Sequence, residues 1–265
     1  MIIFLINAVK IVFILGFLVF IHEGGHFIIA KLCKVKVNEF AIGFGPTIWN
    51  KQGKETKYAL RLIPLGGFVS MEGEEERSEE EGSFSNASIL RRIAIVMAGG
   101  IVNIVFALIV YFFLMFFTCN NMSNVVDTTI PGYSVENSIT GNIYFAFEKT
   151  TNFLFSIIDN MKMLFTGNVK INQFMGPVGI GEVVAGTKGI GEFVYILALI
   201  SISLGVTNLL PFPPLDGGKV IILLIEGIRK KPLNENVELK IQMIGFCILI
   251  GLSIVVTYND ILRIF

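Results

Sequence analysis

IIFLINAVKIVFILGFLVFIHEGGHFIIA, at residues 2–30, is a long apolar stretch that ends in a His-Glu-Gly-Gly-His motif. A hydrocarbon core about 30 Å thick is crossed by about 20 helical residues, so this stretch can span a membrane. It lacks the basic start and the short apolar run of a cleavable signal peptide, which favours a span that remains in the protein. His22 and His26 are four residues apart and share one helical face, with Glu23 beside them. Because two imidazoles in this arrangement can bind one Zn²⁺, the sequence predicts a metal site within a membrane helix.

The composition indicates several membrane spans rather than one. The 265 residues are 53% hydrophobic and 16% charged, which is far more apolar than an average soluble domain. We therefore expect an α-helical polytopic membrane protein with a single domain, residues 1–265. The formal net charge is zero and gives no indication of nucleic-acid binding. The four expected transmembrane helices lie near 2–30, 93–117, 193–210 and 241–257.

Lysine and arginine are distributed unevenly between the expected spans. Residues 31–92 hold ten of them and residues 118–148 hold none, while residues 229–240 before the last span hold four. The positive-inside rule places the two basic segments in the cytoplasm. Both termini of this multi-pass cell-membrane protein are then expected outside, and His22 and His26 lie toward the cytoplasmic side.

Residues 37–71 predict a small β-hairpin sheet on the cytoplasmic side of the membrane. This loop alternates between β-branched or aromatic runs and turn sequences, although a plain connecting loop is the alternative. The run at 72–81 contains seven glutamates and is expected to form a solvated linker. Strands are predicted at 37–49, 58–63 and 68–71, with turns at 51–54 and 64–67.

The expected outer side of the protein is small. Residues 118–142 are fewer than the roughly 40 that fold alone without staples, so no extracytoplasmic domain is expected there. Residues 143–165 predict an amphipathic helix on the outer membrane face or packed on the spans, because apolar residues recur at alternating spacings of four and three. A gate for substrate access is the functional alternative for this helix.

The third span ends in NLLPFPPLDGG, at residues 208–218, whose prolines and glycines must break the helix. Ionisable residues at membrane depth cost roughly 2.5–3.5 kcal/mol on insertion scales, and Asp216 lies at this margin. The first and third spans run in the same direction, which brings Asp216 to the level of His22 and His26. We expect Asp216 to be the third zinc ligand, with water at the fourth position. The alternatives are a turn aspartate, two histidines hydrogen-bonded to neighbouring helices, and a Glu23 that orients a ligand.

These motifs resemble, in kind and in order, those of the site-2 proteases, specifically the RseP-like group, along nearly the whole chain. The resemblance implies cleavage within the membrane, with His22, His26 and Asp216 holding Zn²⁺ and Glu23 acting as base and acid. Its implied partners are transmembrane protein substrates, such as single-span proteins or signal-peptide remnants, and the lipid bilayer. The motifs that carry the resemblance are residues 22–26, 43–45, 64–69, 176–180, 208–218 and 259–260.

The resemblance also implies how a substrate is held. Asn208 is expected to add a hydrogen bond to the reacting group, although it could instead cap backbone groups. The hairpin is expected to hold an unwound substrate as an added strand, which is a physically sound mode of peptide recognition. The expected substrate-binding residues of the sheet are Gly43, Phe44, Gly45, Gly66 and Gly67.

Two features depart from the family pattern. Relatives carry one or two PDZ domains between the second and third spans, and this chain is expected to lack them. Ala98-Gly99-Gly100 stands where many relatives have Ala-Gly-Pro. Two other functions remain open: a noncatalytic receptor or chaperone that binds unwound transmembrane helices, and a metal transporter. The receptor would have no need for Glu23 beside an open zinc position, and a transporter would need ionisable residues along a path to the other side.

Overall fold

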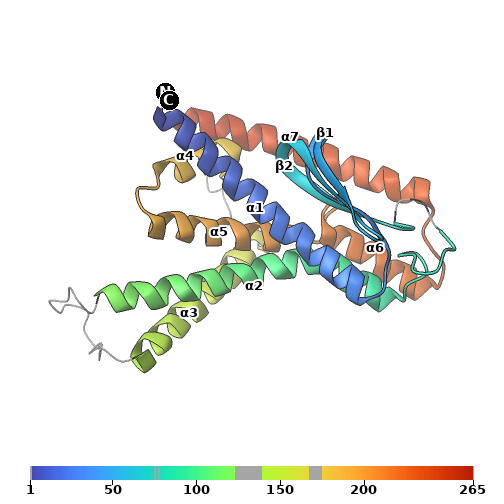
Figure 1. Ribbon diagram of the computed structural model, residues 1–265, viewed down its shortest axis with the longest axis horizontal. Helices are drawn as coiled ribbons and strands as arrows, with labels where there is room; N and C mark the ends of the chain where they lie inside the picture. The colour runs from blue at the N-terminus through green and yellow to red at the C-terminus, as the bar shows by residue number, and fades with distance from the viewer. Residues whose placement is uncertain (1, 75, 77, 123–138, 167–174, 265) are drawn as a thin grey trace. The chain divides into compact units, whose positions relative to one another are not determined.

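The structure is a computed structural model that describes residues 2–74, 76, 78–122, 139–166 and 175–264 (Figure 1). The expectation of no outer domain at residues 118–142 falls largely on residues 123–138, which lie outside this part of the chain. The elements follow one another as α1 (Ile2–Leu32), β1 (Val37–Gln52), β2 (Lys57–Met71), α2 (Ile89–Met122), α3 (Ile139–Phe165), α4 (Pro177–Gly186), α5 (Ile190–Asn208), α6 (Asp216–Arg229) and α7 (Glu235–Ile264).

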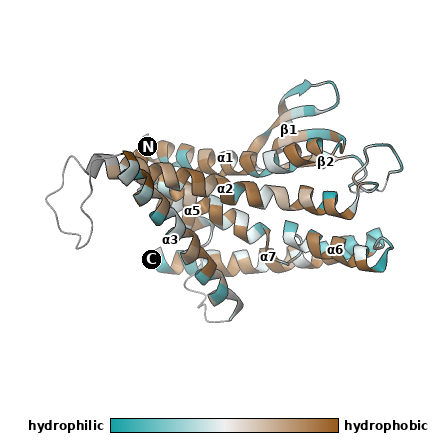
Figure 2. Cartoon of the chain, turned by 90° about the horizontal axis from the view of Figure 1, so that it is seen from below, coloured by the Kyte–Doolittle hydropathy of each residue, from teal (hydrophilic) through white to brown (hydrophobic). Residues whose placement is uncertain are grey.

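Four helices in the described part of the chain are long and apolar enough to cross a membrane. Figure 2 shows them largely in brown, with hydrophilic teal concentrated at the hairpin tip and near α6. α1, α2 and α7 extend beyond the predicted apolar cores, whereas α5 begins earlier and ends at Asn208, before the predicted end at residue 210. The first turn of α7 contains Glu235 and Glu238, whose charge suits a helix N-terminus. The predicted fold class, a helical polytopic membrane protein with a small sheet, is confirmed. The four candidate spans are Ile3–Leu32, Ile89–Cys119, Ile190–Asn208 and Glu235–Arg263.

The chain divides into two compact units. The first comprises Met1–Ile104 and Ser203–Val255, and the second comprises Val105–Ile202 and Val256–Phe265. The first unit has a buried core in which the end of α1, the sheet, the start of α2 and α6 meet. Phe84 is 1% exposed within this core and fixes the segment between β2 and α2. The core residues are Ala30, Val35, Val37, Phe40, Val69, Met71, Phe84, Ile95, Val96 and Leu223.

β1 and β2 pair as an antiparallel hairpin whose strands both bend. Residues 39–42 of β1 have two sets of partners in β2, at residues 57–60 and at residues 67–70. Gly43, Gly45 and Gly66 have φ values of +87°, +84° and +109°, a conformation that other residues rarely adopt. The turn predicted at residues 64–67 is therefore a bend, and the third predicted strand is the end of β2.

The acidic run after β2 is less solvated than predicted. Glu74 Oε1 accepts a hydrogen bond from Lys219 Nζ at 2.6 Å, and Glu80 Oε2 accepts one from Lys36 Nζ at 3.2 Å. The prediction considered only repulsion within the run, whereas the fold brings cations from α6 and from the segment after α1 close to it. These ion pairs tie part of the run to α6 and to the segment after α1.

The second unit contains α3, α4 and the end of α7. The rings of Tyr111 on α2 and Phe153 on α3 are stacked, with centroids 4.3 Å apart. Gly179 of α4 donates its backbone N–H to Asp260 Oδ2 at 2.8 Å. The helix expected at residues 143–165 is present as α3. Ala146 and Phe153 on this helix are buried, whereas Phe147 is 65% exposed, so α3 packs within the second unit through the face that carries Ala146 and Phe153.

Candidate metal centre and active site

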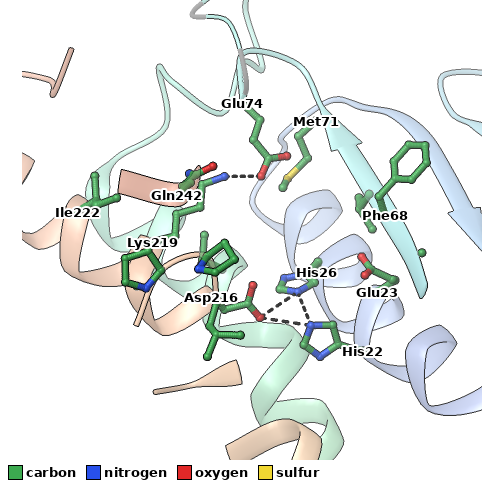
Figure 3. Close-up of a pocket in the computed structure, with 17 residues that line it drawn as sticks. His22, Glu23, His26, Phe68, Met71, Glu74, Asp216, Lys219, Ile222 and Gln242 are labelled. Carbon is green, nitrogen blue, oxygen red and sulfur yellow. Dashed lines mark hydrogen bonds and ion pairs between the residues drawn. The ribbon is translucent and has the colours of Figure 1, made fainter. Parts of the chain in front are cut away.

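His22, His26 and Asp216 meet in the first unit (Figure 3). The histidines lie one turn apart on α1, and Asp216 is the first residue of α6. Their Nε2 atoms are 3.3 Å apart. Asp216 Oδ2 lies 3.3 Å from His22 Nε2 and 3.4 Å from His26 Nε2. Three possible ligand atoms from opposite ends of the chain thus form a nearly equilateral triangle.

The triangle has the size that a zinc ion requires. Ligands about 2.0–2.1 Å from a tetrahedral zinc ion are about 3.3–3.4 Å from one another, which agrees with all three sides. Asp216 Oδ2 is buried and has no hydrogen-bond partner among the described residues. Such an oxygen is costly to bury unless a cation binds it. The residues therefore fit Zn²⁺, and two imidazoles with one carboxylate leave the fourth position open for water.

One face of α2 supports both imidazoles. His26 Nδ1 donates to the carbonyl oxygen of Ile95 at 2.8 Å, which leaves the Nε2 lone pair for a metal. One turn further along α2, a Cβ atom on Gly99 would collide with His26 Nε2 and His22 Cε1. After another turn, Asn103 Nδ2 lies 3.4 Å from His22 Nδ1. The histidines thus pack on residues at spacings of four along α2.

The segment between α5 and α6 delivers Asp216 to the histidines. Phe212 O accepts a hydrogen bond from the backbone N–H of Leu215 at 2.9 Å, which closes a tight turn immediately before α6. A Cβ on Gly217 would collide with the carbonyl oxygens of Leu209 and Leu210, directly after α5. A Cβ on Gly218 would come within 2.7 Å of Pro213 N. The Leu-Asp-Gly-Gly sequence therefore allows α6 to begin directly against its own connecting segment.

A cavity of about 260 Å³ lies beside the three residues. Glu23 lines it, and Figure 3 shows its carboxylate beside the imidazoles on the side that faces β2. A Cβ on Gly67 would come 3.1 Å from Glu23 Cγ, so β2 packs closely on the Glu23 side chain. The residues from β2 that line the cavity are Gly67, Phe68, Val69 and Met71.

The predicted substrate-binding residues divide into two groups. Gly67 lines the cavity, whereas the other five do not. Asn208 is the last residue of α5 and is half-buried. Phe44 is 49% exposed, and its ring lies against the Cα of Gly66. Gly43 and Gly45 lie with Phe44 and Gly66 at the bend of the sheet.

Several residues at the site were not predicted from the sequence. Lys219, Glu74 and Gln242 line the cavity, and Asn103 contacts an imidazole. Asn103 had a usable signal, because an isolated asparagine in an apolar span is costly unless it has a polar partner. Lys219 and Glu74 lie in polar segments outside the predicted spans, where charged residues are ordinary and carry no such signal. Gln242 lies at the start of the predicted fourth span, where a polar residue is also ordinary.

Comparisons with known proteins agree on one family. A family model, peptidase family M50, matches residues 10–252. A protein of Clostridium acetobutylicum that carries a zinc metalloprotease name is 30% identical over 329 positions, covering 96% of this chain and 97% of the relative. Zinc metalloprotease RasP of Bacillus licheniformis is 26% identical over 416 positions, covering 98% and 99%.

These alignments are longer than the chain, so both relatives contain segments that this chain lacks. The match nevertheless includes the helix with the His-Glu-Gly-Gly-His motif and the start of α6. The chain belongs to peptidase family M50, the site-2 protease family of membrane zinc metalloproteases.

Proposed function

We propose that this protein hydrolyses a peptide bond in or near the transmembrane segment of membrane protein substrates. The observation that carries the proposal is the triangle of His22, His26 and Asp216 beside a cavity that Glu23 lines. A metal triangle alone is also compatible with metal storage or structural support. An acidic side chain beside the triangle, in a cavity that borders a strand edge, favours hydrolysis of a polypeptide.

His22, His26 and Asp216 would hold the zinc ion in this proposal. Bound there, Zn²⁺ supplies a Lewis acid that activates water and polarises a carbonyl group. His22 and His26 are each 9% exposed, and such burial strengthens electrostatic interactions at the reacting bond. The site is proposed to lie toward the cytoplasmic side, because the basic segments flank that end of the spans.

Glu23 would transfer the protons. Its carboxylate takes a proton from the attacking water and then gives that proton to the leaving amine. The Glu23 carboxylate becomes a carboxylic acid when it accepts the first proton, so it can then donate this proton to the amine. Glu23 lines the cavity beside the triangle (Figure 3), where groups bound by the metal would also lie.

The outer edge of residues 67–71 would hold the substrate. These residues pair with β1 along one edge and line the cavity along part of their length. A helical substrate hides its carbonyl groups in its own hydrogen bonds, so it must unwind before attack. Pairing with an exposed strand edge would supply new partners for the freed backbone groups. Asn208 is proposed as a hydrogen-bond donor to the negative charge that develops on the carbonyl oxygen.

The test is cleavage of a single-span peptide by purified protein in detergent, with Glu23→Gln as the decisive variant. The amide is similar in size but cannot accept the proton, so we expect bound zinc to remain and turnover to fall at least 100-fold, as for loss of a general base. Glu55→Gln is the matched control, since Glu55 is an exposed partner of Lys31 away from the cavity. Unchanged turnover of Glu23→Gln would remove Glu23 from the mechanism.

A further inference from the structure

The two histidines at the metal site are oriented by different groups on their Nδ1 sides. His26 donates to the backbone carbonyl of Ile95, an interaction that every residue at position 95 would provide. His22 Nδ1 instead faces the side-chain amide of Asn103. Since a side chain can be replaced and a backbone carbonyl cannot, the orientation of His22 depends on the residue type at position 103.

Asn103 is buried on the face of α2 that contacts His22. It is 0% exposed and lies within the apolar span Ile89–Cys119. An amide at this depth is unfavourable unless it is hydrogen-bonded. Ile95, Gly99 and Asn103 are spaced four residues apart, so they lie on the face of α2 that contacts the imidazoles.

The chemistry of imidazole fixes which amide atom must face His22. If His22 Nε2 binds a metal, its proton must be on Nδ1, and Nδ1–H then needs an acceptor. The amide nitrogen of asparagine cannot accept a hydrogen bond, whereas its oxygen can. A half-turn of the terminal amide exchanges the two atoms without moving the rest of Asn103.

We propose that Asn103 is a positioning residue that selects the metal-binding tautomer of His22. In the zinc-bound protein, Asn103 Oδ1 accepts the hydrogen bond from His22 Nδ1–H. The nitrogen Nε2, 3.3 Å from Asp216 Oδ2, is then unprotonated, and its lone pair is available to the metal. Removing the acceptor leaves Nδ1–H without a buried partner and favours the other tautomer, which cannot bind metal through Nε2. This proposal rests on the metal site proposed above.

Zinc affinity measured by competition with a chelator tests the proposal in three variants. Asn103→Leu has a similar size but no acceptor, and we expect it to bind zinc 10- to 100-fold more weakly, the usual effect of losing an outer partner of a metal-bound histidine. Asn103→Asp provides acceptor oxygens in both orientations, and we expect affinity within about threefold of the wild type. Asn142→Leu is the matched control, because Asn142 is a buried asparagine of the second unit and should leave affinity unchanged.

The outcomes separate this proposal from the metal site on which it rests. Weak binding by Asn103→Leu with normal binding by Asn103→Asp supports the selection of the tautomer. Equal loss in both variants, or no loss in either, overturns it while zinc binding by the wild type still supports the site. If His22→Ala binds zinc as tightly as the wild type, the metal site itself is wrong and the role of Asn103 falls with it. Near-ultraviolet circular dichroism of each zinc-free variant checks that the fold is intact.

Discussion

At the scale of single residues, Gly99 sets how closely α2 approaches the histidines. Its missing side chain leaves the space that the two imidazoles occupy, and a Cβ there would overlap His26 Nε2. Histidines held by a buried hydrogen bond cannot move aside without breaking it. The metal site thus depends on a residue that contributes no functional group.

Gly99→Ala is therefore expected to weaken zinc binding at least tenfold, because one imidazole must leave its position. The measurement is zinc affinity by chelator competition. Gly251→Ala on α7 is the control, since a Cβ there meets nothing within 4 Å. Alanine is the better helix former, so this control should keep its affinity. Equal affinity of Gly99→Ala and wild type would show that the imidazoles do not rest on α2 as described.

At the scale of elements, one buried ion pair ties α2 to α6. Arg92 Nη1 and Glu226 Oε2 are 2.9 Å apart, and Glu226 Oε1 accepts the backbone N–H of Leu233. The side chain of Glu226 is only 5% exposed. Because α6 begins with Asp216, this pair also helps to hold the third zinc-binding residue in place.

Arg92→Leu should lower the free energy of unfolding by about 3–5 kcal/mol, since it leaves a buried carboxylate without its cation. Reversible unfolding of the zinc-free protein in detergent measures the change. Lys162→Leu removes one partner of the exposed pair with Asp159 and should change stability by less than about 1 kcal/mol. A similar small effect for Arg92→Leu would mean that water reaches Glu226.

The sheet contains a carboxylate whose ionisation stabilises it. Partial burial acts to raise the pKa of Glu39, but hydrogen bonds from Arg61 and Lys57 outweigh it and hold this pKa below its ordinary value. Folding therefore favours the charged form. This contribution is complete above the ordinary pKa of about 4.3 and is lost as the pH falls through the lower folded value.

The stability difference between wild type and Glu39→Gln should consequently be constant near neutral pH and shrink below about pH 4.3. Unfolding of both zinc-free proteins between pH 6 and pH 3 measures this difference and cancels effects of other groups. A difference that grows on acidification would have the wrong sign for a depressed carboxyl pKa and would contradict the pairing with Arg61.

At the scale of the whole molecule, a metal at this site would cross-link α1 to α6. The two helices come from distant parts of the sequence, and few of their described residues contact each other directly. A ligand that binds only the folded state stabilises it, by about 2.7 kcal/mol when its free concentration is 100 times its Kd. Removing zinc with a chelator should thus lower the unfolding temperature of the wild type, and added zinc should restore it. The unfolding temperature of Asp216→Ala should respond far less, and an equal response would place the metal elsewhere.

The spans and the grouping of Asp216 with the histidines could be predicted from the sequence, because each depends on a feature that is visible locally in the chain. The spans follow from apolar length, and Asp216 could be assigned to the histidines because a helix break and equal membrane depth limit where it can lie. Asn103 and Gly99 were missed because their importance depends on which face of α2 packs on α1. The bend at Gly66 was predicted as a turn, since sequence does not show that the flanking residues pair with the same strand.

The most direct test of the account is the position of the cut in a single-span substrate. Purified protein in liposomes would be incubated with a labelled substrate, and mass spectrometry would identify the new termini. We predict cleavage within or at the margin of the apolar segment, dependent on zinc and absent in His26→Ala. Cleavage confined to soluble flanking segments, or cleavage that survives in His26→Ala, would contradict a membrane zinc site as the catalytic centre.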